Sequence, residues 1–207
     1  MVHSDDKGLV LPPKIARISV VVVPIFKEEN KDEVLGAARA LVKNISHPNI
    51  NTIKLDDRDR RPGDKFYEWE RKGVPIRIEI GPKDISNNSV VIVRRDTGEK
   101  KNVSQDGLSE IISETLADIQ KNLYDRAMKF RDEKTKTADS WDEFVKLIDG
   151  GNFVLAHFDG TRETEAEIKK ETNATIRCIP LDTKEESGKC VKSGNASKGR
   201  VIFARSY

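Results

Sequence analysis

The stretch Ile18-Ser-Val-Val-Val-Val-Pro-Ile25 decides the fold class of this 207-residue chain. It is almost continuously apolar and rich in β-branched residues, which is typical of a strand buried on both faces of a parallel sheet. Apolar residues at helical spacing then predict a helix that begins near Asn30 and ends before Pro48. Thr52–Leu55 predicts the next strand, so this region indicates a βαβ unit within an α/β fold.

The middle of the chain alternates between short strands and helices. Asp64 predicts the start of a short helix that carries Phe66 and Trp69. Ile76–Ile80 alternates isoleucine with charged residues, as a strand with two different faces does. The other elements expected here are a hairpin at Ser89–Arg95 with Lys100–Val103 and a long amphipathic helix at Leu108–Phe130. A helix tail and linker is expected to follow at 131–139.

A second, smaller α+β pattern follows this linker. Trp141, Phe144 and Ile148 predict a helix that is ended by two glycines, and a strand is expected at Phe153–Phe158. A charged helix is expected at Glu163–Glu171. A small antiparallel sheet is expected from three strands, at Thr175–Ile179, Cys190–Lys192 and Arg200–Ala204.

Composition excludes several classes of protein. Lys and Arg exceed Asp and Glu by 37 − 35 = 2, so the chain has no strong net charge. No apolar run approaches the roughly 20 residues of a membrane-spanning helix. Two cysteines do not make a disulfide framework. We therefore expect a cytoplasmic protein that does not act on a membrane.

The motifs of nucleotide-binding and hydrolytic enzymes are missing. The first predicted βα turn, Pro24–Asn30, has no glycine to let a phosphate approach the backbone, and the histidines have no catalytic spacing. No catalytic residue is predicted. Basic and aromatic residues gather at 58–101, interleaved with acids, which leaves a nucleic-acid-binding face and a solvated charged surface as alternatives.

Six segments of the chain, in order, resemble prolyl-tRNA synthetases of the eukaryotic/archaeal type. They cover essentially the whole chain and are Ser4–Pro13, Trp69–Pro75, Glu79–Asp84, Val93–Lys100, Thr175–Pro180 and Phe203–Tyr207. The resemblance implies three parts. Residues 1–13 correspond to the tail of the family's catalytic domain, residues 14–135 to an anticodon-binding domain with a mixed five-stranded sheet and flanking helices, and residues 136–207 to a small α+β C-terminal domain.

The resemblance also implies the function. The full-length enzyme would ligate proline to tRNA(Pro) through a prolyl-adenylate, using ATP and magnesium, as a homodimer formed by its catalytic domain. This chain lacks the class II motifs, so we expect it to be non-catalytic by itself and to need no cofactor. We expect it to bind tRNA(Pro) but not DNA. Whether this chain by itself is a monomer is left open. The alternative is a stand-alone RNA-binding module that reuses the anticodon-binding fold.

Four residues are predicted to contact the anticodon. Proline anticodons contain two constant guanines, whose O6 and N7 atoms suit an arginine fork and whose N–H donors suit a carboxylate. Glu70 and Arg77 match family positions that we associate with this contact, and Arg94 and Lys100 are second candidates on the adjacent hairpin. Solvated surface positions, or phosphate contacts for Arg94 and Lys100, remain the alternatives.

The resemblance raises a metal question. Many members of this family carry four cysteines in the C-terminal domain, where they bind a structural zinc ion. Cys178 and Cys190 match two of these positions, but Ser193 replaces the partner that should follow Cys190. Because structural zinc sites are normally four-coordinate, we predict no metal here.

Overall fold

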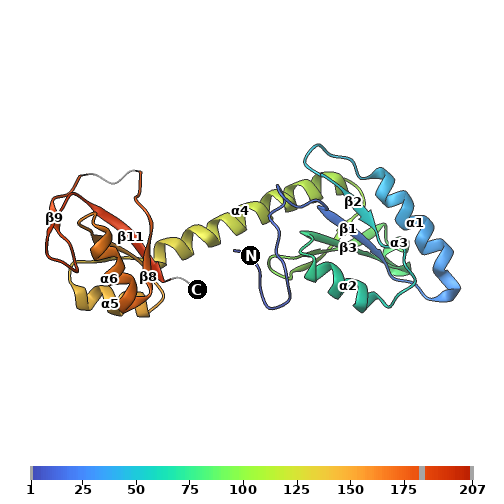
Figure 1. Ribbon diagram of the computed structural model, residues 1–207. Coiled ribbons are helices and arrows are strands. Elements are labelled where there is room, and N and C mark those ends of the chain that lie inside the picture. Colours follow the sequence, from blue (N-terminus) through green and yellow to red (C-terminus); the bar gives the residue numbers. More distant parts are fainter. Residues whose placement is uncertain (1, 182–184, 206–207) are drawn as a thin grey trace. The chain divides into compact units, whose positions relative to one another are not determined.

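Figure 1 shows the computed structural model, which describes residues 2–181 and 185–205. The chain divides into two compact units, Met1–Ala127 and Met128–Tyr207. The division falls inside the long helix α4 (Leu108–Lys134), and each unit has its own hydrophobic core. None of the described helices is both long and apolar enough to cross a bilayer.

A mixed five-stranded sheet in the order β2-β1-β3-β4-β5 forms the centre of the first unit. β1 pairs in parallel with β2 and β3, whereas β4 pairs antiparallel with β3 and β5. All five residues of β1 are buried, as its apolar run predicts, and the expected α/β class is confirmed. The strands are Val20–Pro24 (β1), Ile53–Leu55 (β2), Ile76–Ile80 (β3), Ser89–Arg94 (β4) and Lys100–Ser104 (β5).

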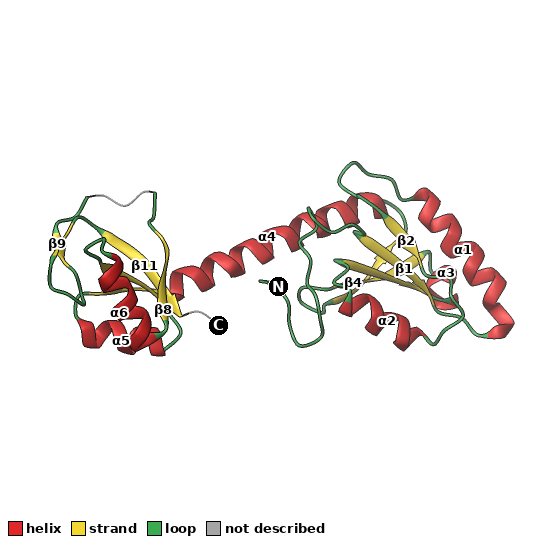
Figure 2. Ribbon diagram, in the orientation of Figure 1, coloured by secondary structure: helices red, strands yellow, loops and turns green. Residues whose placement is uncertain are grey.

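Helices cover both faces of this sheet (Figure 2). Helix α1 (Lys31–Asn44) and α4 pack on one face, where Val20 and Val22 point into an aliphatic cluster. Helix α2 (Pro62–Arg71) packs on the other face, where Val21 and Val23 contact Trp69. The alternation of side chains along β1 therefore divides the unit into an α1/α4 side and an α2 side.

Three local predictions for the first unit need correction. Helix α2 begins at Pro62 rather than at Asp64, because proline has a fixed φ that suits the first helical position. A single-turn helix, α3 (Pro82–Ser86), follows β3 where only a break was expected. A 3-10 turn, η1 (Glu28–Asn30), precedes α1, and the Asn30 side chain accepts a hydrogen bond from the Lys27 amide rather than capping α1.

The second unit packs two helices against a four-stranded sheet in the order β6-β7-β11-β8. The Phe144 ring is fully buried between Trp141, stacked at 5.3 Å, and Phe203, edge-on at 5.1 Å. These contacts confirm the small α+β domain. Its elements are β6 (Thr135–Ala138), α5 (Trp141–Asp149), β7 (Phe153–His157), α6 (Arg162–Thr172), β8 (Ala174–Cys178), β9 (Gly188–Lys189), β10 (Ala196–Ser197) and β11 (Arg200–Arg205).

The connections of the second unit differ from the prediction in two places. Residues 135–138 are not a linker but strand β6, which pairs in parallel with β7. β6 is an edge strand in which only Ala138 is buried, so its Thr and Lys side chains give no apolar signal. Cys190–Lys192 is not a strand either, because residues 190–195 turn back on themselves through a hydrogen bond from the Cys190 amide to the Asn195 carbonyl, at 2.8 Å.

Candidate nucleic-acid interface

Buried charge lies between the sheet and α2. Asp56, just after β2, is 2% exposed and accepts hydrogen bonds from Trp69 Nε1 at 2.7 Å and from both Nε and Nη2 of Arg58 at 2.7 Å. The Lys65 side chain, 1% exposed, donates to the Asp56 carbonyl at 3.1 Å. Burial by itself would raise the pKa of Asp56, but the bonds from Arg58 and Trp69 lower it to about 2. Asp56 therefore anchors α2 to the sheet as a carboxylate.

Arg77 of β3 is held from two sides. Its Nε and Nη2 donate to Glu79 Oε1 at 3.1 and 2.9 Å, and its guanidinium lies 4.2 Å from the centre of the Phe66 ring of α2. Lys100 approaches the same Glu79 oxygen at 3.4 Å. A planar guanidinium that is fixed by a carboxylate and an aromatic ring loses little further freedom when it binds a ligand.

The Arg77 side chain is largely covered rather than solvated. Its side chain is 11% exposed and that of Glu79 is 10% exposed. The alternation of β3 is as predicted, with Ile76 and Ile78 on the opposite face, but α2 covers the face that carries the charges. Phe66 packs against the small core cluster on this face and also supports Arg77, so it combines a core role with a stacking role.

Three of the four predicted residues border one small pocket. Glu70, Arg77 and Arg94 line it together with Trp69, Val93 and Arg95. The Glu70 side chain is 29% exposed in the last turn of α2, and its nearest cation is Lys7, at 3.9 Å. Lys100 does not line the pocket, but it joins the group through Glu79.

The Arg94 guanidinium already binds a neighbouring carboxylate. Its Nε and Nη2 bind the two carboxylate oxygens of Asp96 at 3.1 and 2.9 Å, and its Nη1 lies 3.7 Å from Asp118. The hydrogen bonds with Asp96 raise the pKa of the Arg94 guanidinium further above its usual range. Arg94 and Arg77 thus each donate two of their five N–H groups to a neighbouring carboxylate, and Arg94 has a second carboxylate, that of Asp118, close to its Nη1 atom.

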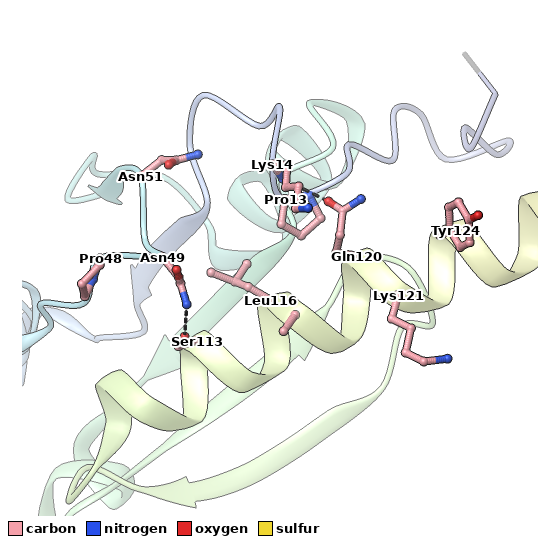
Figure 3. A pocket seen from close by; sticks show the side chains of 11 residues that line it. Pro13, Lys14, Pro48, Asn49, Asn51, Ser113, Leu116, Gln120, Lys121 and Tyr124 are labelled. Carbon is pink, nitrogen blue, oxygen red and sulfur yellow. Dashed lines mark hydrogen bonds between the residues drawn. The ribbon is translucent and has the colours of Figure 1, made fainter.

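A larger open groove lies elsewhere on the first unit (Figure 3), where the chain before β1 and the loop after α1 meet α4. Asn49 donates to the Ser113 hydroxyl at 3.1 Å, and the Gln120 side chain accepts from the Lys14 amide at 3.1 Å. The groove is on the α1/α4 side, and the four predicted residues do not line it. Its size alone therefore does not mark the interface.

The metal question concerns the second unit. Cys178 is exposed and Cys190 is buried, and Ser193 donates a hydrogen bond to Asp159 Oδ2 at 2.6 Å. Asp159 also accepts from Thr164 at 2.9 Å; burial by itself would raise the pKa of Asp159, but these bonds hold it well below its usual range. Among the described residues no three His, Cys, Asp or Glu side chains converge as metal ligands do. The donor set does not fit a zinc ion.

Sequence reasoning missed two supporting residues near the pocket. Glu79 holds Arg77, and Arg95, whose side chain is 5% exposed, joins the N-terminal segment to α2. The alternation of β3 could have placed Glu79 beside Arg77. Arg95 was one basic residue among many between 58 and 101, and no sequence signal separates it from a surface arginine.

Comparisons with known proteins cover both units. A family model described as "Anticodon binding domain" matches residues 19–115, and one described as "Prolyl-tRNA synthetase, C-terminal" matches residues 141–207. A protein named "Proline--tRNA ligase" from Porphyromonas gingivalis is 48% identical over 209 residues, which are 100% of this chain and 42% of the relative.

Two further relatives with the same name come from other bacteria. The Flavobacterium psychrophilum protein is 48% identical over 210 residues, all of this chain and 42% of its own length. The Chlorobaculum tepidum protein is 47% identical over 215 residues, all of this chain and 44% of its own length. The chain thus spans less than half the length of these relatives. Residues 19–115 are therefore similar to an anticodon-binding domain, and residues 141–207 are similar to the C-terminal domain of prolyl-tRNA synthetases.

Proposed function

We propose that the first unit recognises the anticodon of tRNA(Pro), with Glu70 and Arg77 as the principal base contacts and Arg94 and Lys100 beside them. The observation that carries this proposal is the grouping of Glu70, Arg77 and Arg94 around the small pocket on the α2 side, with the Arg77 guanidinium stacked on Phe66. The free volume of this pocket is only about 10 Å³, so a base would bind against its rim rather than inside it. A carboxylate and an oriented arginine are the two groups that a guanine edge requires, and of Glu70 and Arg77 only Arg77 is held by side-chain hydrogen bonds here.

The roles follow from the geometry of each group. Arg77 has N–H groups beyond the two that bind Glu79, and these can donate to guanine O6 or N7. Glu70 is acceptor-only when ionised, so it suits the N–H donors of the base. Lys100 is 56% exposed and suits a phosphate, and Arg94, which is bound to Asp96, suits a supporting role.

For the whole protein, we propose the ATP- and magnesium-dependent ligation of proline to tRNA(Pro) by a homodimer, with no role for DNA. The printed names of the relatives support the ligase activity. We also propose that the protein belongs to the eukaryotic/archaeal type of the family, which its motifs resemble. This type would then also occur in bacteria. Full-length protein should catalyse proline-dependent exchange of pyrophosphate into ATP, and residues 1–207 alone should not.

The anticodon contact is tested by binding to two transcripts, tRNA(Pro) and the same RNA with its two anticodon guanines replaced by adenines. Arg77→Lys keeps the charge beside Glu79 but loses the fork, and Glu70→Gln keeps the shape but loses the carboxylate. Each should reduce the discrimination between the transcripts by about 1–3 kcal/mol. Lys72→Ala, at an exposed helix end, is the control and should weaken both RNAs alike. Unchanged discrimination in both folded variants would remove these residues from the interface.

Salt dependence provides a second measurement. Phosphate contacts by lysines and arginines release counterions, so the affinity for tRNA(Pro) should fall as the salt concentration rises. Affinity that does not depend on salt, or no binding at low salt, would contradict an RNA face on this unit.

We further propose that the second unit folds without metal, with Asp159 and Ser193 closing the turn after Cys190. Elemental analysis of protein that was purified without chelator should show far less than one zinc per chain. A stoichiometric amount of zinc would overturn this proposal.

A further inference from the structure

The segment Asp5–Leu11, here called the N-terminal strap, lies against the carboxyl end of α2 (dark blue in Figure 1). The Leu9 amide donates to the Arg71 carbonyl at 3.1 Å, and the Leu11 amide donates to the Gly73 carbonyl at 3.3 Å. Val10 between them is 6% exposed and belongs to the main core cluster. The strap is therefore part of the folded unit, although its sequence has no periodicity.

Two glycines let the strap touch the end of α2 directly. A Cβ atom at Gly8 would lie 2.6 Å from Arg71 Cα, and one at Gly73 would lie 2.7 Å from the Leu9 carbonyl oxygen. Both glycines also have positive φ angles, +132° and +72°, which other residues rarely adopt. Any side chain at either position would push the two backbones apart.

Arg95 connects the strap to Glu70. Its Nη1 and Nη2 donate to the two carboxylate oxygens of Asp5 at 2.8 and 2.7 Å, and its Nε donates to the Glu70 carbonyl at 2.9 Å. Nη2 also reaches the Gly8 carbonyl at 3.3 Å. The bond with Arg95 lowers the pKa of Asp5 to about 2, so this pair stays ionised at neutral pH. A single buried guanidinium thus joins the strap to the backbone of Glu70.

We propose that Asp5 and Arg95 are positioning residues that fix the backbone at Glu70 and so set the selectivity of the pocket for guanine. This inference rests on the proposed function. Asp5 itself is half exposed and need not touch the RNA. Asp5 acts through Arg95, because the Arg95 Nε atom donates a hydrogen bond to the backbone carbonyl of Glu70. Glu70 in turn carries the carboxylate that would bind the base. Release of Asp5 frees the fork and loosens the last turn of α2, which weakens the directional contact with the base more than any phosphate contact.

The test uses Asp5→Asn, with Asp6→Asn as the matched control, because Asp6 is the next residue and its side chain is exposed. The dissociation constants for tRNA(Pro) and for the guanine-to-adenine transcript are measured below the melting temperature of each variant. The discrimination ratio is the dissociation constant of the guanine-to-adenine transcript divided by that of tRNA(Pro). Asp5→Asn should reduce this ratio roughly fivefold or more, while the dissociation constant of the substituted transcript stays unchanged. Asp6→Asn should keep the ratio of the wild type, and Asp5→Glu should restore part of it.

Gly8→Ala provides an independent variant, because it displaces the strap without removing a charge. It should reduce the ratio in the same direction. If both variants fold and keep the ratio of the wild type, the inference is wrong and the proposed function stands. If both unfold, the strap only stabilises the fold, and the inference is again wrong. A wild-type chain that does not separate the transcripts overturns the proposed function and this inference with it.

Discussion

The two faces of the five-stranded sheet are built from different chemistry. On the α1/α4 side, the 17 buried members of the core cluster are all Val, Ala, Leu or Ile. On the α2 side, the cluster has only Val21, Val23, Trp69 and Val74 as buried members, and Asp56, Lys65 and Glu79 are buried close by.

This difference separates a source of stability from a source of side-chain orientation. Burial of aliphatic surface is non-directional and stabilises the fold in proportion to area. Buried ion pairs contribute little net stability, since desolvation offsets their attraction, but they fix side chains in one orientation. The α1/α4 side therefore supplies most of the folding free energy, and the α2 side fixes the orientation of Arg77.

The largest effect is expected on the aliphatic side. Ile112 of α4 is 0% exposed, so Ile112→Ala should lower the free energy of unfolding by about 2–5 kcal/mol. Glu114→Ala, on the exposed surface of the same helix, is the control and should change it by less than about 0.5 kcal/mol. Urea titrations at neutral pH measure both values. A loss below about 1 kcal/mol for Ile112→Ala would show that this face is not the main source of stability.

A smaller effect is expected on the α2 side. Asp56→Asn keeps the shape of the side chain but removes the charge that accepts bonds from Arg58 and Trp69. Loss of charged hydrogen bonds should lower the free energy of unfolding by about 1.5–3 kcal/mol at pH 7. The same urea titration measures it. A change near zero would mean that Asp56 does not anchor α2.

The sequence predicts the aliphatic side well, because burial of that side is periodic. Leu108, Ile112 and Leu116 mark one face of α4, and the β-branched run of β1 marks a strand covered on both faces. The sequence does not reveal β6, because only one residue of this edge strand is buried, nor α3, because a single turn has no period.

The charged side is less predictable. Each charged residue has the pattern of a surface position, and only the packing of α2 shows that Lys65 and Arg77 are covered. Only the family resemblance places Glu70 and Arg77 at one site. The contact between Asp5 and Arg95 joins residues 90 positions apart, and nothing local in the sequence marks either one.

The pH dependence of stability separates the two sides further. The pKa of Asp56 is lowered to about 2 from 3.8, so its contribution to stability is complete above about pH 4 and is lost as the pH falls towards 2. The wild type should therefore lose about 2 kcal/mol more than Asp56→Asn between pH 5 and pH 2. Urea titrations of both proteins at several pH values measure this difference. Parallel pH profiles would show that the carboxylate is not stabilised in the fold.

The smallest effect is expected at Lys65, although its side chain is fully buried. Burial lowers the pKa of Lys65, so the ammonium is less stable in the fold than in the unfolded chain. Lys65→Met fills the same space without a charge, and it should change the free energy of unfolding by less than about 1 kcal/mol at pH 7.

Because the folded pKa of Lys65 is depressed, the wild type should gain stability from this group as the pH rises towards 10.5, and Lys65→Met should lack that gain. Lys65→Ala is the control for lost volume and should cost more than Lys65→Met. If Lys65→Met lowers the free energy of unfolding by more than about 2 kcal/mol, the ammonium stabilises the fold through Asp56, and the α2 side contributes stability as well as orientation.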